Sequence, residues 1–307
     1  MKLHEISKKE TKVQSAIKAM RKYATILEYA EFYRMVGNSD APRKAATASG
    51  GQYRALNDNY VSNTTAPLYA SMNLKIFGDK IELDKAHERR AGDIPSERAR
   101  QLLSFAKQFG RNFQNEFFNG STLNNVKAWN GLAKIMPAQQ VIIGSEEGLL
   151  LQTGNSDTAY KAKQQFIEKL QQLVSMVDGG PDVIYMNESV LARLTSIASD
   201  IILWNKNEFG NYIPYFAGVP LRTAGYNSAG TAIIQANELF GEYNTATTIY
   251  AMKFGEKEDL TIATNVGLTV DNIGLVNNMY VDVFELDADI GLLNNRAVAA
   301  LKGIVIE

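Results

Sequence analysis

The feature that most constrains the fold is a long amphipathic segment, residues 93–119. Its apolar side chains recur every three or four residues and share one face, as in an α-helix. They are Leu102, Phe105, Ala106, Phe109, Phe113 and Phe117. Asp93 or Ser96 can cap the start, and Asn119-Gly120 ends the pattern. A helix over these residues spans roughly 40 Å, which is long beside a globular mean of about 11–12 residues.

The other elements are interleaved without the regular strand-helix-strand period of a doubly wound sheet. Helical periodicity extends over residues 8–36, 158–177 and 189–199. The pattern predicts strands at residues 182–186, 219–223, 231–235, 247–254, 260–264 and 279–286, and residues 297–306 are expected to be a terminal strand or an apolar tail. The mixture predicts an α+β fold. A chain of 307 residues allows about two domains at roughly 150 residues each.

The first predicted helix, residues 8–36, is locally basic in a chain whose formal net charge is -1. Residues 1–36 contain eight Lys or Arg and four Glu, an excess of four positive charges. The cations that could face DNA are Lys8, Lys9, Lys12, Lys18, Arg21 and Lys22. The apolar stripe between them favours docking on the rest of the protein, and one helix can do both. Residues 37–52 are small and polar and are interpreted as a linker.

Residues 53–92 are predicted to form an extended hairpin. Two alternating runs, 72–77 and 81–85, flank Gly78-Asp79, a pair typical of a hairpin turn. A lone hairpin is marginal in water, so it is expected to lie on its own domain or to pair with another chain. The residues expected to make an intersubunit contact are Leu74, Lys75, Ile76, Lys80, Ile81, Glu82, Leu83, Lys85, Arg89 and Arg90.

The residue inventory excludes several kinds of chemistry. Cysteine is absent and the histidines are His4 and His87, so thiolate and three-histidine metal sites are excluded. No phosphate-binding loop or dinucleotide-binding glycine motif is present. Residues 225–230 have one residue too many before the serine for a nucleophile elbow. The sequence therefore predicts no catalytic, cofactor-binding or metal-binding residues.

Neither membrane insertion nor secretion is predicted. The apolar runs are shorter than the ~20 residues that a membrane-spanning helix needs. The N-terminal residues are basic but lack the apolar segment that follows in a signal peptide.

Several short motifs follow the long helix in a recognisable order. They are Trp129-Asn130-Gly131-Leu132, residues 181–187, Gly218-Val219-Pro220-Leu221, residues 267–270, residues 281–287 and residues 297–301. Preceded by a basic arm, a linker and an extended hairpin, this order resembles the major capsid proteins of tailed phages. Their Hong Kong 97-like fold is shared with encapsulin shells. The resemblance extends over nearly the whole chain.

The resemblance implies five segments. They are an N-terminal helical arm and linker (1–52), an E-loop hairpin (53–92), a P-domain with its spine helix (93–142), an A-domain (143–266) and a return to the P-domain (267–307).

The resemblance also implies a structural protein that is not an enzyme. Such a subunit would self-assemble through hexamers and pentamers into an icosahedral-type shell around viral double-stranded DNA. Portal, scaffolding and decoration proteins are expected partners, with packaged DNA on the inner face, no cofactor and no membrane. The expected location is the virion capsid, assembled in the host cytoplasm. Two alternatives stay open: an encapsulin-like compartment of the same fold, and a soluble hydrolase or binding protein, which the residue inventory disfavours.

Overall fold

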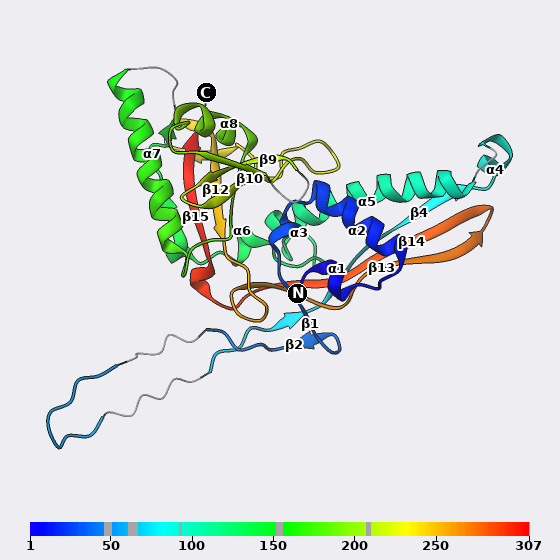
Figure 1. The fold of residues 1–307 in the computed structure, drawn as a ribbon, viewed down its shortest axis with the longest axis horizontal. Coiled ribbons are helices and arrows are strands. Elements are labelled where there is room, and N and C mark those ends of the chain that lie inside the picture. Colours follow the sequence, from blue (N-terminus) through cyan, green and yellow to red (C-terminus); the bar gives the residue numbers. More distant parts are fainter. Residues whose placement is uncertain (46–50, 61–66, 92–93, 152–155, 207–209, 307) are drawn as a thin grey trace.

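The computed structural model describes residues 1–45, 51–60, 67–91, 94–151, 156–206 and 210–306. Figure 1 shows two lobes and an arm that projects away from both. The elongated lobe contains the sheet of order β1-β13-β14-β4, and the compact lobe contains the nine-stranded sheet. The arm leaves the chain between β2 (Ser39–Asp40) and β3 (Met72–Asn73), which pair with each other.

The elongated lobe is built on α5 (Ile94–Asn119), which confirms the predicted long helix. Beside it runs a hairpin of two long strands, β13 (Leu260–Val276) and β14 (Met279–Leu292). Asn277 and Asn278 join the strands with positive φ angles of 45° and 67°, as a two-residue type I′ turn requires. The sheet is completed by β4 (Lys75–Asp84) and by β1 (Phe32–Arg34), which is parallel to β13.

Aromatic side chains fill the space between α5 and this sheet. The rings are Phe77, Phe105, Phe109, Phe113, Trp129 and Phe284, with neighbouring centroids 4.8 to 6.2 Å apart. Rings at this spacing bury large apolar areas and prefer the tilted and edge-on arrangements found here. The stripe predicted from the sequence is therefore the side of α5 that faces the sheet.

The N-terminal segment packs on the same core. Helix α1 (Leu3–Ile6) precedes α2 (Thr11–Tyr23), and Val13, Ala16, Ile17 and Met20 of α2 are buried in the cluster that contains Phe113. Docking by the apolar stripe is thus confirmed. The predicted single helix over 8–36 is wrong in its second half, where α3 (Ile26–Tyr29) and β1 follow α2.

The compact lobe has the strand order β5-β15-β12-β7-β10-β9-β8, with β6 beside β15 and β11 beside β12. Helix α7 (Asp157–Met176) and helix α8 (Glu188–Ile197) pack against it through a second apolar core that includes Phe166, Leu170 and Leu194. The strands are β5 (Val141–Ile143), β6 (Leu149–Leu150), β7 (Val183–Met186), β8 (Leu203–Lys206), β9 (Tyr212–Phe216), β10 (Val219–Thr223), β11 (Glu238–Phe240), β12 (Tyr243–Met252) and β15 (Val298–Val305).

Most strands predicted in the second half are confirmed, but residues 231–235 are not a strand. They contribute only an isolated bridge between Tyr226 and Ala232. Short elements join the lobes or end strands: α4 (Ala86–Ala91), α6 (Leu132–Ile135), η1 (Ala138–Gln140) and η2 (Asn295–Ala297).

The predicted hairpin turn at Gly78-Asp79 is wrong. Strand β4 runs through it, and every residue from Lys75 to Asp84 pairs with β14. Glycine is required here for a different reason, because a Cβ at position 78 would lie 2.7 Å from the carbonyl oxygen of Phe284. Gly78 therefore permits close strand packing, and the long-range ladder overrides the local turn signal.

Candidate assembly interface

The projecting hairpin exists, but it lies earlier in the chain, at residues 38–74, hereafter the arm. Its base is an antiparallel ladder in which residue 39 faces 73, 40 faces 72 and 43 faces 69. Backbone hydrogen bonds from Leu74 to Asn38 and from Lys44 to Leu68 extend the same register. Every one of these pairs is centred on residue 56. A turn lies at that centre, where Asp58 donates to the carbonyl of Ala55 and Asn57 has a φ of 71°.

The base of the arm is fastened to the elongated lobe. Met72 is buried, and Tyr33 donates its hydroxyl hydrogen to the Met72 sulfur at 3.3 Å. Asp289 of β14 accepts the backbone N–H of Asn73 at 2.8 Å. Burial raises the pKa of Asp289 despite the hydrogen bonds from the Asn73 and Ile290 backbones, which lower it. The arm is therefore anchored firmly where it leaves the lobe.

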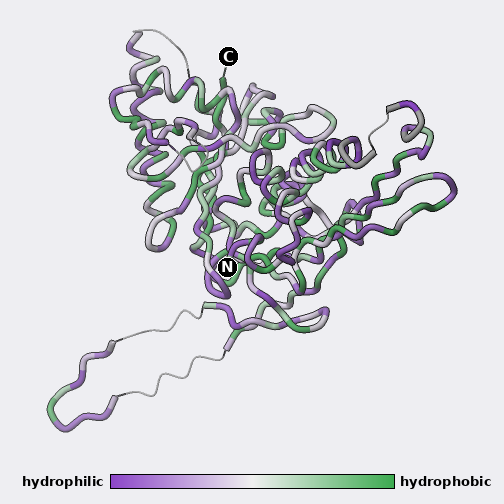
Figure 2. The backbone as a smooth tube through the Cα atoms, turned by 45° about the vertical axis from the view of Figure 1, so that its right-hand side comes forward, coloured by the Kyte–Doolittle hydropathy of each residue, from purple (hydrophilic) through white to green (hydrophobic). Residues whose placement is uncertain are grey.

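The described residues at the far end of the arm, 51–60, project away from both lobes. All ten residues 51–60 are exposed, among them Tyr53, Leu56 and Tyr60, and Leu56 is 89% exposed. Figure 2 shows the arm as mostly hydrophilic, with a hydrophobic stretch at its far end. Leu68 and Tyr69 add exposed apolar surface closer to the base. Large apolar side chains grouped on an exposed projection are typical of a binding surface.

Sequence reasoning missed these residues because they lie among Ala, Ser, Thr, Gly and Asn, which suggest a linker. One signal was available. Aromatic and leucine side chains recur within 53–69 in a segment that contains no helical or strand period.

Six of the ten expected contact residues belong to β4, and its pleat divides them between two faces. Phe77, Ile81 and Leu83 face the core beneath α5, and Leu74 is buried beside Met72. Ile76, Lys80 and Glu82 alternate with them on the opposite, outer face. Ile76 is 73% exposed there, and Lys80 pairs with Glu82 at 2.7 Å.

The remaining expected contact residues are scattered. Lys75 is half-buried at the start of β4, and the backbone N–H of Lys85 donates to the carbonyl of Asn278 at the tip of the β13-β14 hairpin. Arg90 is exposed on α4. The side chain of Arg89 lies outside the part of the chain that the structure describes.

The outer face of the sheet is acidic. Carboxylates share it at six positions, which are Glu82 and Asp84 of β4, Asp271 of β13, and Glu285, Asp287 and Asp289 of β14, the last of them at the base of the arm. Among the residues of these strands on that face, Lys80 is the cation. The arm has the opposite sign by one charge, because residues 38–74 contain Arg43, Lys44 and Arg54 against two acids, Asp40 and Asp58. Arm and face are therefore complementary in charge, and both expose apolar side chains.

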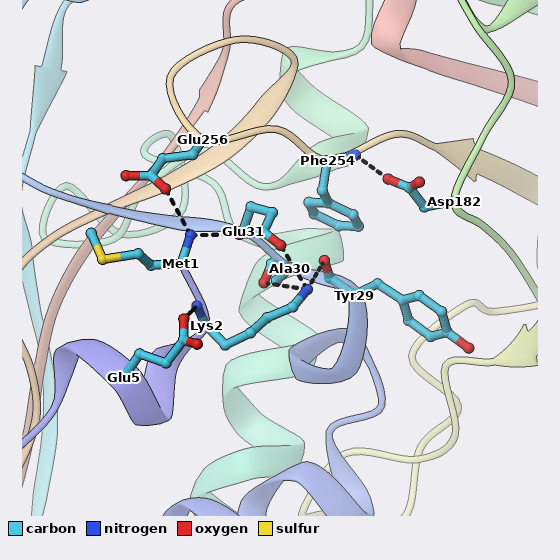
Figure 3. Close-up of polar contacts among 9 residues, drawn as sticks. All are labelled: Met1, Lys2, Glu5, Tyr29, Ala30, Glu31, Asp182, Phe254 and Glu256. Carbon is cyan, nitrogen blue, oxygen red and sulfur yellow. Dashed lines mark hydrogen bonds and ion pairs between the residues drawn. The ribbon is translucent and has the colours of Figure 1, made fainter. Parts of the chain in front are cut away.

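The basic residues of the N-terminal segment lie around the docked helix. Lys8, Lys9, Lys12, Lys18 and Lys22 are exposed, and Arg21 is half-buried. Hydrogen bonds and ion pairs also attach the first two residues, Met1 and Lys2, to the end of α3 and the segment that follows it. Figure 3 shows Lys2 donating to the carbonyl of Tyr29 at 2.8 Å and pairing with Glu31, while the Met1 ammonium contacts both Glu31 and Glu256. Burial alone would raise the pKa of Glu31, but the hydrogen bonds from Met1 and Lys2 lower it below its ordinary value.

The described residues contain no group of three or more His, Asp or Glu placed to hold a metal ion. Within the same residues, no helix combines the length and the apolar character that crossing a bilayer requires. His4 lies on α1 and His87 on α4, far apart in the fold.

Solved structures similar to this chain are protein shells. The holo-SrpI encapsulin complex from Synechococcus elongatus PCC 7942 matches with a TM-score of 0.63 and 12% identity, over 92% of this chain and 87% of that one. The capsid of a native GTA particle matches with a TM-score of 0.60 and 13% identity, over 92% and 91%. The capsid of the myovirus phage XM1 matches with a TM-score of 0.56 and 14% identity, over 92% of each chain.

No family model matches the sequence, and no curated protein matches it either. The structural matches therefore establish the fold. The chain has the Hong Kong 97-like fold, and the expected α+β class is confirmed. The similar proteins are structural shell subunits, and none of the three is an enzyme.

Proposed function

We propose that this chain is the repeating subunit of a closed, icosahedral-type shell and that it joins its neighbours through the arm. The observation that supports this best is the arm itself. It is anchored at its base, yet the ten residues around its centre are all exposed and include Tyr53, Leu56 and Tyr60. A monomer gains no stability from such a projection. The shared fold with capsids and encapsulins supports the same conclusion.

The proposed receiving surface is the outer face of β4, β13 and β14 on a neighbouring copy. Leu56 is twelve positions beyond Lys44, so the chain between them has a contour length of at most about 40 Å at ~3.3 Å per residue, long enough to reach a neighbouring copy. Ile76 offers exposed apolar surface there, and Glu82 and Glu285 offer charge that complements Arg54. Ile76, Lys80 and Glu82 are thus contact residues in this proposal, on the receiving side.

Each subunit would both extend one arm and receive one. Many weak contacts of this kind stabilise a closed assembly, because each contact makes the next one intramolecular. Hexamers and pentamers of the subunit, and separate portal, scaffolding and decoration proteins, belong to the same proposal.

Double-stranded viral DNA is the proposed content, in a virion capsid assembled in the host cytoplasm. The support is the exposed lysine group that includes Lys8, Lys9 and Lys12, since lysines bind phosphate backbones without sequence preference. An encapsulin-like compartment is the second candidate, because an encapsulin is among the similar structures. The two candidates are distinguished by treating intact particles with nuclease, opening them and analysing their contents. Protected DNA of uniform length supports the capsid. A single enzyme cargo without DNA supports the compartment.

The arm is tested by replacing residues 45–67 with Asn-Gly. Lys44 and Leu68 are already hydrogen bonded, so a two-residue turn can close the ladder beyond them. The expected product is a folded subunit that forms no shells. Normal shells from this variant would contradict the proposed role of the arm. Deleting residues 70–84 is not a clean test, because it removes β4 with its buried Leu83.

A further inference from the structure

A buried polar network joins the two lobes, and α3 lies at its centre. Figure 1 shows α3 where the elongated and compact lobes meet. The side chain of Gln114, on α5, is 1% exposed and bonds in two directions. Its amide oxygen accepts the backbone N–H of Ile26 at 3.1 Å, and its amide nitrogen donates to the carbonyl of Ala224, after β10, at 2.6 Å. One side chain thus fixes α5, α3 and the compact lobe together.

An ion pair makes a second link across the same junction. Arg222 of β10 pairs with Glu28 of α3, and the two side chains are 13% and 12% exposed. The Arg222 guanidinium also lies 5.8 Å from the ring centroid of Tyr29. A third link joins the hydroxyls of Thr25 and Tyr185, which are 2.8 Å apart. Burial raises the pKa of Tyr29 to about 12, so this ring stays neutral at ordinary pH.

Such a network contributes more to geometry than to stability. A buried ion pair roughly offsets its own desolvation, and apolar replacements of similar size often leave stability unchanged. Hydrogen bonds with fixed donors and acceptors nevertheless select one arrangement of the elements they join. Four segments that are distant in the sequence meet here at defined distances: residues 25–29, α5, β7 and β10.

We infer that Gln114, Glu28 and Arg222 are positioning residues that hold the two lobes at one angle and so restrict the shell to one size. This inference rests on the proposed function. The arm and the sheet that would receive it both belong to the elongated lobe, whereas the compact lobe is built on a different sheet and shares an apolar core with α5 at the junction. The angle between the lobes therefore sets the rotation from one subunit to the next, and that rotation decides where an assembly closes.

The test compares two double variants. The first, Glu28→Gln with Arg222→Met, removes the ion pair between the lobes without leaving a buried charge. The matched control, Arg98→Met with Asp282→Asn, removes a pair of similar burial within the elongated lobe, where Arg98 and Asp282 are 2.8 Å apart and 22% and 9% exposed. Particle diameters are measured by electron microscopy, and the thermal midpoint of each free subunit is measured by circular dichroism.

The junction variant is expected to fold with a thermal midpoint close to that of the control, and to form particles whose spread of diameters is about two-fold broader or more, because closure needs a fixed rotation. The control is expected to keep the single diameter of the unmodified protein. Equal, narrow distributions for both variants would overturn the inference, and so would equal broadening.

Tyr185→Phe provides a milder variant if the double change prevents folding. It removes only the hydroxyl that contacts Thr25, and a broadened distribution is again expected. An unchanged distribution for this variant counts against the inference. The proposed function fails separately, if the unmodified protein forms no closed particles at all.

Discussion

Removing the apolar side chains at the far end of the arm should greatly raise the subunit concentration needed for assembly while leaving the subunit folded. The change is Tyr53→Ser, Leu56→Ser and Tyr60→Ser together. These side chains are exposed and make no core contact, so each substitution should alter the free energy of unfolding by less than about 0.5 kcal/mol. The unfolding transition of the free subunit should therefore stay where it is.

The effect on assembly should be large by comparison. Burying one large apolar side chain contributes about 1.5–3 kcal/mol, and ordering it costs about 0.5–1.5 kcal/mol. Three such side chains in one arm contact then contribute roughly 3–5 kcal/mol net. At about 1.4 kcal/mol for each factor of ten, the subunit concentration needed for assembly should rise by roughly 10²-fold to 4 × 10³-fold.

Sedimentation velocity over a series of subunit concentrations measures this threshold directly. The matched control is Tyr53→Phe, Leu56→Met and Tyr60→Phe, which keeps apolar area at all three positions and should assemble at nearly the original concentration. The reasoning is refuted if the serine variant assembles at the same threshold as the control. It is also refuted if the serine variant is unfolded, since the far end of the arm would then support the subunit itself.

Three further outcomes are expected. The Phe113 ring is fully buried, with its centroid 5.9 Å from that of Trp129. Phe113→Ala should therefore destabilise the subunit by about 3–5 kcal/mol and lower its melting temperature by roughly 10 °C. A shift in melting temperature of less than a few degrees would contradict the packing described. Glu31→Gln should cost up to about 1 kcal/mol near neutral pH. Met1 and Lys2 lower the pKa of Glu31 below 4.5, so this stabilisation is present above pH 4.5 and is lost as the pH falls through the pKa of the folded state. Denaturant titrations at acidic pH should therefore give the same free energy of unfolding for the variant and the unmodified protein. Raising NaCl from 0.1 M to 1 M shortens the screening length from about 10 Å to about 3 Å. Because this weakens the attraction between the arm and the sheet face, the subunit concentration needed for assembly should rise severalfold. A concentration threshold independent of salt would contradict the charge complementarity of the two surfaces.

The sequence predicts the long helix well because its signal is local. Five large apolar residues of α5, Leu102 to Phe117, repeat at helical spacing, and any burial of that stripe stabilises the same helix. The docking of α2 was predictable on the same ground. Strand β10 was also found with its observed bounds, because Val219 to Thr223 is a short segment with alternating apolar Val219 and Leu221 between Gly218 and the Ala224-Gly225 pair.

The hairpin was misplaced because its register depends on distant residues. Gly78-Asp79 has the local chemistry of a turn, but ten residues of β14 pair with β4 across it and stabilise one continuous strand. The arm was missed for the opposite reason, because its local sequence lacks any hairpin signal although it forms a ladder. Its ladder pairs residues such as Ser39 and Asn73, whose local sequence carries no alternation, and the buried Met72 and Tyr33 hold its base. No local rule contains that information.

The junction between the lobes was invisible to sequence reasoning for a similar reason. Gln114 follows Phe113 on α5 and has nothing local to distinguish it from a surface residue. It is buried because Ile26 and Ala224 bring a backbone donor and a backbone acceptor to its two ends.

Cryo-electron microscopy of the purified protein, across a range of concentrations, tests the central claim most directly. Closed hollow particles are predicted, with residues 51–60 of each subunit lying on the outer face of β4, β13 and β14 of a neighbour. A protein that stays monomeric at every concentration would contradict the claim that this chain is a shell subunit. Closed particles in which the arm touches only its own subunit would contradict the proposed mode of assembly.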